Sequence, residues 1–402
     1  MTGVEQLPEP VPYPFGEPVG LDLHPTYHEL LASGALLRVR MPFGEPAWLV
    51  TRQADIKVVL GDPRFSRARA IGAQEPRVMP VRQRPGTILA LDPPEHTRLR
   101  RAVARAFTAR RTETLRQRAT EVVGELLDEL QKQGPPADLV PSFALPLPVI
   151  IICELLGVPY ADWDRFRQWS DLVMSAGAVP RDRAVAALEE LGEYLAGLAG
   201  QRRVAPADDL ISALMHAADV EDRLTVAEAV GLSSGVLVAG YETTANEIAN
   251  FCYLLLTSPD HHRQLRQRPE LIGPAVEEML RFVPHRAHAA FARVATEDVE
   301  LGGVLIRAGE AVLPALIAAD RDPTAFTEPD TLDFHRTDNS HLAFGYGPHH
   351  CLGAQLARME LQVAIGGLLA RFPDLALAVP AEDVPWRTGM VARGPRQLPV
   401  TW

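Results

Sequence analysis

Residues 344–353 read FGYGPHHCLG, and this stretch governs the interpretation of the whole chain. It places Cys351 in a glycine-rich loop, directly before the helix-forming run AQLARMELQVAIGGLLARF. Gly345, Gly347 and Gly353 permit backbone conformations that other residues resist, so the loop can fold tightly beneath a flat ligand. A helix N-terminus lowers the pKa of a nearby thiol, and the resulting thiolate can bind iron. The stretch therefore makes Cys351 a candidate metal ligand.

Two other interpretations of Cys351 remain open at this point. Most free cysteines are buried and inert, and Cys351 can be one of them. The second alternative is a zinc site built from His349, His350 and Cys351. It is weak, because zinc takes four ligands and the chain has no further pair with the spacing of a zinc finger.

The same stretch resembles the haem-binding signature of the cytochrome P450 family, Phe-Gly-x-Gly-x-x-x-Cys-x-Gly, with every defining position filled. The resemblance implies a mainly helical fold with small β-sheets, shaped as a triangular prism, in which haem b lies between a long central helix and the cysteine loop. It makes Cys351 the axial ligand of the haem iron. It also places Phe344, Gly345 and Gly353 around the haem and directs His349 to a haem propionate.

The length of 402 residues would by itself predict two or three domains. No low-complexity linker or repeat divides the chain, so we expect a single P450 domain over residues 1–402. The expected β-rich parts lie near residues 37–51, 293–315 and 375–402, and the expected helical body covers residues 90–285 and 352–372.

Composition and charge narrow the class of protein further. A net charge of -11 argues against nucleic-acid binding, and 47% hydrophobic residues are enough for a large core. The proline-rich N-terminus has no apolar run that could anchor a membrane, and the three cysteines imply no disulfide framework. We expect a soluble, cytoplasmic monomer of the bacterial kind. With no fused reductase expected, its electrons would come from a ferredoxin and an NAD(P)H-dependent ferredoxin reductase.

A second signal is AGYETT at residues 239–244, inside an expected helix from about residue 225 to 256. No charge occurs between Glu228 and Glu242, which predicts that this part of the helix is buried. Gly240 should cost the helix about 1 kcal/mol relative to alanine. By the resemblance, residues 239–240 mark a kink over the haem. Glu242 and Thr243 would then form the acid and alcohol pair that supplies protons when dioxygen is cleaved.

A third signal is Glu278 and Arg281, whose spacing places both side chains on one helix face. The spacing alone means little, because Glu113 and Arg116 have it too. By the resemblance, the pair at 278 and 281 has a structural role and braces the loop under the haem.

Haem carries two propionates that need cationic partners. His96 and Arg100 share a helix face in PPEHTRLRRAVARAFTARR and match the His-x-x-x-Arg of the family. Arg293 matches the other propionate arginine.

The same segment carries a basic surface with no acid between residues 96 and 111. By helix geometry Arg98, Arg101 and Arg105 point away from His96. We therefore expect this face to receive an acidic ferredoxin. A solvated helix face is the alternative.

The chain is closest to bacterial hydroxylases and epoxidases that tailor macrolides and other polyketides, which implies a monooxygenase acting on a hydrophobic natural product in antibiotic biosynthesis. Oxidative ring closure or coupling, peroxide-driven oxidation and a non-catalytic haem-binding or carrier-recruiting protein are the alternatives. Arginines between residues 67 and 84, with the segment PHRAHAAFA, weakly favour a substrate with carbonyl, hydroxyl or acidic groups, although solvent-facing side chains are the simpler interpretation. The expected substrate contacts are Val238, Ala239, Ala289, Phe291 and Met390.

Overall fold

The computed structural model describes residues 8–17, 19–72, 74–79, 82–104, 107, 109–173, 179–221, 223–289 and 291–402. Its helices are α1 (Pro25–Ser33), α2 (Gln53–Gly61), α3 (Glu95–Ala104), α4 (Ala109–Gln133), α5 (Pro146–Leu156), α6 (Trp163–Val173), α7 (Arg181–Val204), α8 (Leu210–Asp219), α9 (Val226–Leu256), α10 (Pro259–Gln267), α11 (Ile272–Phe282), α12 (Leu316–Ala319) and α13 (Ala354–Arg371). Its strands are β1 (Val11–Pro12), β2 (Leu37–Arg40), β3 (Ala47–Val50), β4 (Phe65–Ser66), β5 (Ala137–Asp138), β6 (Arg293–Ala295), β7 (Val299–Leu301), β8 (Val304–Ile306), β9 (Ala311–Pro314), β10 (Ala376–Leu377) and β11 (Pro399–Thr401).

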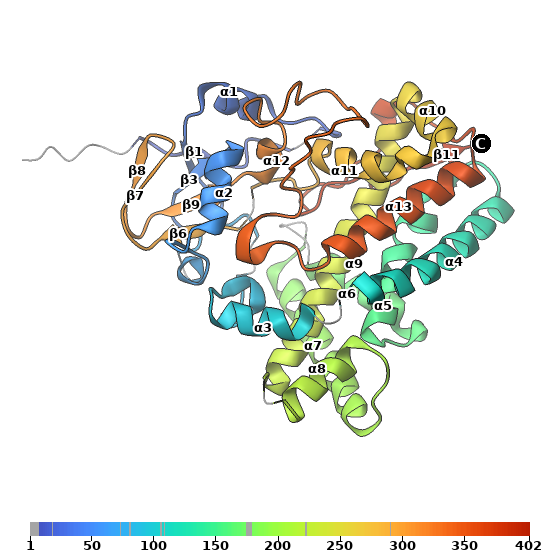
Figure 1. The fold of residues 1–402 in the computed structure, drawn as a ribbon, viewed down its shortest axis with the longest axis horizontal. Helices are drawn as coiled ribbons and strands as arrows, with labels where there is room; N and C mark the ends of the chain where they lie inside the picture. The colour runs from blue at the N-terminus through green and yellow to red at the C-terminus, as the bar shows by residue number, and fades with distance from the viewer. Residues whose placement is uncertain are drawn as a thin grey trace, which may run out of the picture.

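The long helix α9 runs through the middle of the helical part (Figure 1). It begins with a capping box, in which the Thr225 side chain accepts from the Glu228 backbone and the Glu228 side chain accepts from the Thr225 backbone. Helix α5 packs along it, and nearly all of α5 is buried. Helix α13 contacts α4, α9 and α11. The helix that follows the cysteine loop is therefore tied directly to the centre of the molecule.

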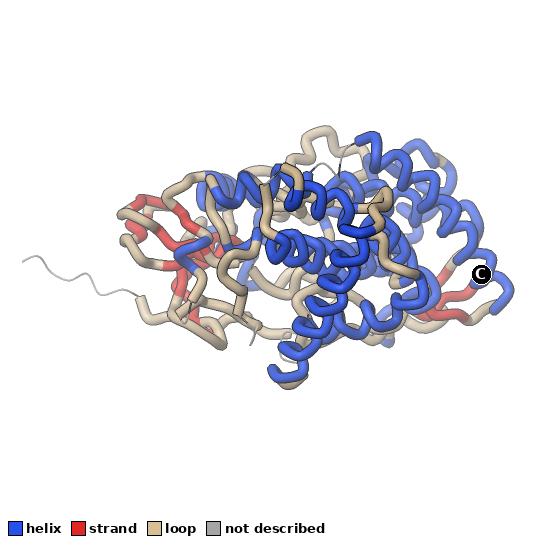
Figure 2. Tube along the Cα trace, turned by 90° about the horizontal axis from the view of Figure 1, so that it is seen from below, coloured by secondary structure: helices blue, strands red, loops and turns tan. Residues whose placement is uncertain are grey.

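The strands gather in two places, at opposite ends of the molecule in Figure 2. The larger sheet has the order β1-β2-β3-β9-β6-β4, and β3 pairs with β9 in parallel with Ala47 opposite Ala311. The smaller sheet has the order β10-β11-β5, and β7 pairs with β8 alone. Strands that come from distant parts of the sequence thus lie side by side, which brings β6 and the Arg293 that begins it next to the N-terminal half of the chain.

The expected fold class, mainly helical with small sheets, is confirmed. The expected β-rich part near residues 37–51 contains the antiparallel pair β2 and β3. Three short strands, β1, β4 and β5, lie outside the segments expected to be β-rich. Each has two residues and is defined by its pairing partner, so its own sequence carries little signal.

No helix among the described residues combines the length and the apolar character that crossing a membrane requires.

One buried acid of α13 makes stability depend on pH. Burial raises the pKa of Glu360 from 4.5 to about 8, and its Oε2 has no hydrogen-bond partner among the described residues. The folded state therefore holds a proton that the unfolded chain releases between about pH 4.5 and 8, so stability falls as pH rises through that window. Glu360→Gln should remove up to about 1.4 kcal/mol of this loss per pH unit, measured by urea unfolding at pH 5, 6, 7 and 8. Glu300→Gln, on the exposed side of β7, is the control, and parallel curves for Glu360→Gln and the unsubstituted protein would contradict the assignment.

Candidate active site

The cysteine loop is shaped by two glycines in the left-handed region. Gly345 has φ 75° and Gly347 has φ 69°, as the sequence predicted. A Cβ on Gly347 would lie 2.5 Å from the backbone oxygen of Leu60, so α2 leaves no room for a side chain there. Gly353 has an ordinary φ of -85° and forms the N-cap of α13, so it does not use the conformational freedom that glycine permits.

The backbone holds the cysteine against the start of the loop. The N–H of Cys351 donates to the carbonyl oxygen of Phe344 at 2.8 Å. The Phe344 ring lies under the guanidinium of Arg358, 4.5 Å from its centre. Arg358 in turn donates from its Nε to Oε1 of Glu277 at 2.7 Å. The loop is thus fastened to both α13 and α11.

The thiol of Cys351 lies in a recess. The residue is accessible, whereas Cys153 and Cys252 are buried with their pKa raised to about 12 by burial. Burial raises the pKa of Cys351 as well, opposed by the N–H of Gly353 and by nearby cations. The predicted lowering of this pKa is therefore wrong for the protein alone, because desolvation outweighs the helix terminus. A bound metal ion supplies the missing positive charge and deprotonates a coordinating thiol.

Four basic groups lie together near this recess without an acid bonded to them among the described residues. They are His96, Arg100, Arg293 and His349. The rings of His96 and His349 lie 4.2 Å apart. His96 Nδ1 and His349 Nε2 are shielded from solvent without hydrogen-bond partners.

Burial disfavours the charged forms of these basic groups, and it lowers the pKa values of His96, Arg293 and His349. Burial, Arg293 and His96 lower the pKa of His349 to about 3. Burial and Arg67 lower the pKa of Arg293 to about 10. Within the described ranges, the Arg293 guanidinium donates to the carbonyl oxygens of Phe291 and Ala292, each at 3.3 Å, and to no carboxylate. Two arginines and two imidazoles to which no acid of the described residues is bonded fit a ligand with two carboxylates, as haem has, and the residues present therefore fit haem.

The same geometry does not support a zinc site. No group of three or more His, Cys, Asp or Glu side chains in the described ranges is arranged to hold a metal ion. His349 lies against the ring of His96 and is one of the four basic groups.

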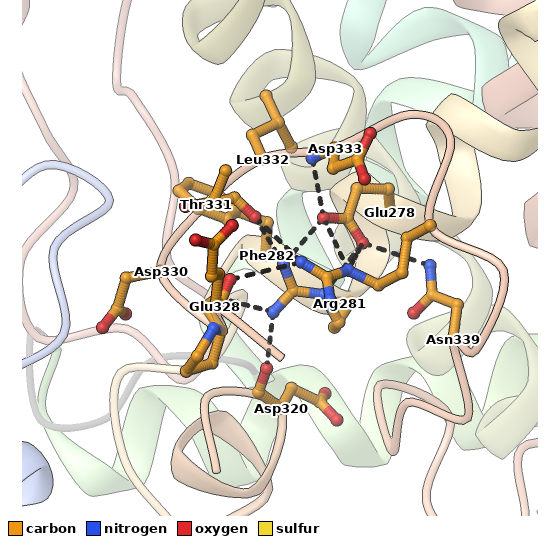
Figure 3. A network of polar contacts seen from close by, with 12 residues as sticks. Glu278, Arg281, Phe282, Asp320, Glu328, Asp330, Thr331, Leu332, Asp333 and Asn339 are labelled. Atoms are coloured by element: carbon orange, nitrogen blue, oxygen red, sulfur yellow. Dashed lines mark hydrogen bonds and ion pairs between the residues drawn. The ribbon is translucent and has the colours of Figure 1, made fainter. Parts of the chain in front are cut away.

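The Glu278 and Arg281 pair is buried and forms the centre of a network (Figure 3). Arg281 donates from Nε and Nη2 to the Glu278 carboxylate at 2.8 and 2.7 Å. Arg281 also donates to the backbone oxygens of Asp320, Pro329 and Thr331, at 2.7 to 3.0 Å. Glu278 further accepts from the Asp333 N–H and from the side chains of Arg336 and Asn339. The pair joins α11 to the segment of residues 320–339 that leads to the cysteine loop.

Helix α9 is not buried over the whole charge-free stretch, which corrects the prediction. Gly231, Gly235 and Ala239, spaced four apart on one face, are exposed. Val238 and Thr243 are half-buried, and the Thr243 hydroxyl donates to the carbonyl oxygen of Ala239 at 2.6 Å. This face of small residues leaves open space beside the helix. A Cβ on Gly240 would approach Ile152 Cδ1 at 2.8 Å, so this glycine also permits close packing with α5.

Glu242 is fully buried and forms an ion pair that the sequence did not predict. Its Oε1 accepts from Arg387 Nη1 at 3.3 Å. Arg387 lies in the turn that also contains Met390, whose side chain is half-buried. The two charged residues are 145 positions apart, and no local pattern in the sequence connects them.

The remaining predicted substrate contacts fall into two environments. Phe291 is half-buried, and Arg67 lies over its ring at 5.0 Å. Ala289 is 3% exposed and packs in a core cluster that contains Tyr13, and its N–H donates to the Tyr13 hydroxyl at 2.5 Å. The structure does not place Ala289 on an open face, although it lies at the edge of a pocket described below.

The predicted basic docking face is smaller than expected. Arg98 donates to the Glu228 carboxylate and to the carbonyl oxygen of Arg223, at 2.5 and 2.7 Å, so its charge is already paired. Arg101 is exposed on α3. Arg105 lies outside the described residues.

Comparisons with known proteins agree with this geometry. A family model described as Cytochrome P450 matches residues 201–385. The chain is 56% identical over 391 residues to nocardicin C N-oxygenase of Nocardia uniformis subsp. tsuyamanensis, covering 97% of this chain and 98% of that protein. It is 51% identical to mycinamicin IV hydroxylase/epoxidase of Micromonospora griseorubida, covering 98% and 99%. A crystal structure described as HinD with NMFT and NO matches with a TM-score of 0.95 at 54% identity, covering 98% of this chain and all of that one.

Proposed function

The chain belongs to the cytochrome P450 family, and from that premise we propose that it is a haem-thiolate monooxygenase. It transfers one oxygen atom from dioxygen to a hydrophobic natural product, by hydroxylation or epoxidation. The named activities of two relatives, an N-oxygenase and a hydroxylase/epoxidase, support this reaction class.

The observation that carries the proposal is an accessible thiol beside two arginines and two histidines to which no acid of the described residues is bonded. Cys351 would ligate haem b iron, and His96, Arg100, Arg293 and His349 would hold its propionates. When bound, the haem supplies the activation of dioxygen that no side chain can provide. The protein holds the macrocycle, fixes the thiolate and excludes water from the space beside α9.

The proton supply is assigned to Glu242 and Thr243. The Thr243 hydroxyl lies on the α9 face that borders the open space, next to the exposed Ala239. Glu242 follows at the preceding position and is held by Arg387. A hydroxyl that donates to a helix carbonyl can rotate and donate its proton into the open space instead. The Glu242 carboxylate would take up a proton from solvent and pass it to the Thr243 oxygen, which restores the hydroxyl.

The test of the function is turnover with defined components. The haem-loaded protein, a ferredoxin, a ferredoxin reductase and NADPH are incubated with polyketide, macrolide and peptide scaffolds chosen by a change in the iron spin state. Product that contains one atom of labelled dioxygen is expected. Product formed without oxygen insertion would indicate oxidative coupling, and product formed with peroxide but not with ferredoxin would indicate peroxide-driven oxidation. No product with any electron source would count against an enzyme.

Thr243→Ala should separate oxygen consumption from product formation. Without the hydroxyl, proton delivery loses its donor, so product per dioxygen consumed should fall on the order of 10²-fold, the scale of general acid catalysis. Oxygen uptake, peroxide release and product are measured together. Thr257→Ala is the matched control, because Thr257 donates to the carbonyl oxygen of Tyr253 at 2.8 Å in the same way at the far end of α9. Retained coupling in Thr243→Ala would contradict the assignment.

We further propose a separate ferredoxin as the electron donor, with Arg101 on α3 as part of its docking face, and a cytoplasmic monomer as the working form. The exposure of Arg101 supports this face, and the pairing of Arg98 with Glu228 limits it.

A further inference from the structure

A small pocket lies between residues 75–79 with 83 on one side and residues 286, 288, 289 and 291 on the other, and Met41 also lines it. Much of its wall is apolar, from Met41, Val78, Met79 and Phe291. Its charged members are Glu75, Arg77 and Arg286. This mixture of apolar wall and convergent cations is typical of a site that orients one end of a small molecule.

The single acid of this wall is already used. Glu75 Oε1 accepts from Arg67 Nη2 at 3.1 Å, and both side chains are buried. The Arg77 guanidinium donates to the carbonyl oxygen of Glu75 at 3.2 Å and lies over the Phe43 ring, and its pKa is lowered by burial and by Arg82. The pocket therefore has more positive than negative charge.

Arg286 is the cation without a partner. Its guanidinium lies over the Phe291 ring at 5.5 Å, and no carboxylate is bonded to it in the part of the chain that the structure describes. Its Nε is shielded from solvent and makes no hydrogen bond. Burial lowers the pKa of Arg286 from its usual value, and the group that opposes this is the hydroxyl of Tyr13.

The groups around Arg286 are neutral near pH 7. The pKa of Tyr13 is raised to about 12, chiefly by burial. The pKa of His285 is lowered to about 3 and that of His288 to about 4, by burial and by Arg286 itself. An unpaired cation in such surroundings is costly to stability, and proteins retain such costs mainly where a ligand offsets them.

The pocket adjoins the residues that would hold the haem. The Phe291 ring lies against both Arg286 and Arg67, and the Phe291 carbonyl accepts from Arg293 Nη1 at 3.3 Å. Phe291 therefore contacts both Arg286 and a member of the set that would hold the haem, Arg293. A group bound at Arg286 would therefore be part of a molecule that is close enough to the active site to be the substrate.

We propose that this pocket binds a carboxylate of the substrate, with Arg286 as its ion-pair partner. The inference rests on the proposed function, whose substrate class it narrows to hydrophobic molecules that carry an acidic group. The planar guanidinium matches a carboxylate through two parallel hydrogen bonds, and the apolar wall receives the adjoining carbon skeleton.

The experiment uses the haem-loaded full-length protein and matched acid and amide probes. The pairs are N-acetyl-L-tryptophan with N-acetyl-L-tryptophanamide, and dodecanoate with dodecanamide. Binding is measured by equilibrium dialysis and by the iron spin state, at low and high salt. The acid of at least one pair should bind about tenfold or more tightly than its amide, a preference of the size of one charged hydrogen bond. The preference should weaken with salt.

Arg286→Gln should abolish the preference for the acid, and Arg286→Lys should keep part of it. Arg84→Gln, an exposed arginine of the same chain region outside the pocket wall, is the matched control and should retain the full preference. Arg286→Met adds a readout that a structural arginine would not give. Without ligand, its melting temperature should be unchanged or higher, because a half-buried charge with no bonded carboxylate among the described residues has been removed.

Four results would overturn the proposal. In the unsubstituted protein, these are equal binding of acid and amide, or no binding of any of the four probes. In Arg286→Gln, they are a retained preference for the acid, or loss of haem, which would assign Arg286 to a haem propionate. Dialysis does not depend on turnover. Failure of the protein to oxygenate any substrate would therefore refute the monooxygenase while leaving a measured preference for acids intact.

Discussion

Cys351→Ser should give a folded protein without haem-thiolate character and without oxygenation activity. The thiolate is the group that the loop presents to the haem, and a serine hydroxyl is not ionised at neutral pH. We expect turnover to fall by at least about 10³-fold, the scale seen when an essential catalytic group is removed. The spectrum of the reduced carbon-monoxide complex reports the axial ligand directly, and haem content is measured on the same sample.

The control for this change is Cys252→Ala. Cys252 is buried in α9 and fills core space, so its replacement should lower the melting temperature slightly and leave the thiolate spectrum intact. A Cys351→Ser protein that kept the thiolate spectrum would show that another residue ligates the iron. Cys351 would then be an inert cysteine, and the assignment of the cysteine loop as the haem-binding loop would fail.

Glu278→Gln should cause the largest loss of stability among the changes considered. Glu278 and Arg281 are 1% and 0% exposed, so the loss of the carboxylate leaves the Arg281 charge buried without its partner. Breaking such a pair costs about 3–5 kcal/mol. Arg336 and Asn339 lose the same acceptor, which removes further ties to the segment before the cysteine loop (Figure 3). Urea unfolding and haem retention during dialysis measure the effect.

The chain supplies its own control for this prediction. Glu113 and Arg116 have the same i, i+3 spacing and bond at 3.2 Å, but their side chains are 72% and 39% exposed. Glu113→Gln should therefore change the free energy of unfolding by no more than about 1 kcal/mol. If Glu113→Gln and Glu278→Gln lowered the free energy of unfolding equally, burial would not determine how much each ion pair contributes to stability. The structural role assigned to Glu278 and Arg281 would then be wrong.

The site shows which predictions the sequence can support. The cysteine loop, its two left-handed glycines and the Glu278 and Arg281 pair depend on residues that are close in the sequence, and their geometry follows from local backbone and helix rules. The predicted pKa of Cys351 was wrong in direction, because a helix terminus is a local feature whereas desolvation depends on everything packed around the thiol.

The sequence by itself thus indicated the family and the helical character, and it named the candidate metal ligand and the basic residues that would be available to a haem. Only the tertiary structure decided which of those charges have partners. Arg387 reaches Glu242, Glu228 takes Arg98 away from a docking face, and Arg286 is left alone beside Phe291. The physical reason is that an ion pair needs two groups within a few ångströms, while burial sets how much an unpaired charge costs. Both quantities depend on chain segments that are far apart in the sequence.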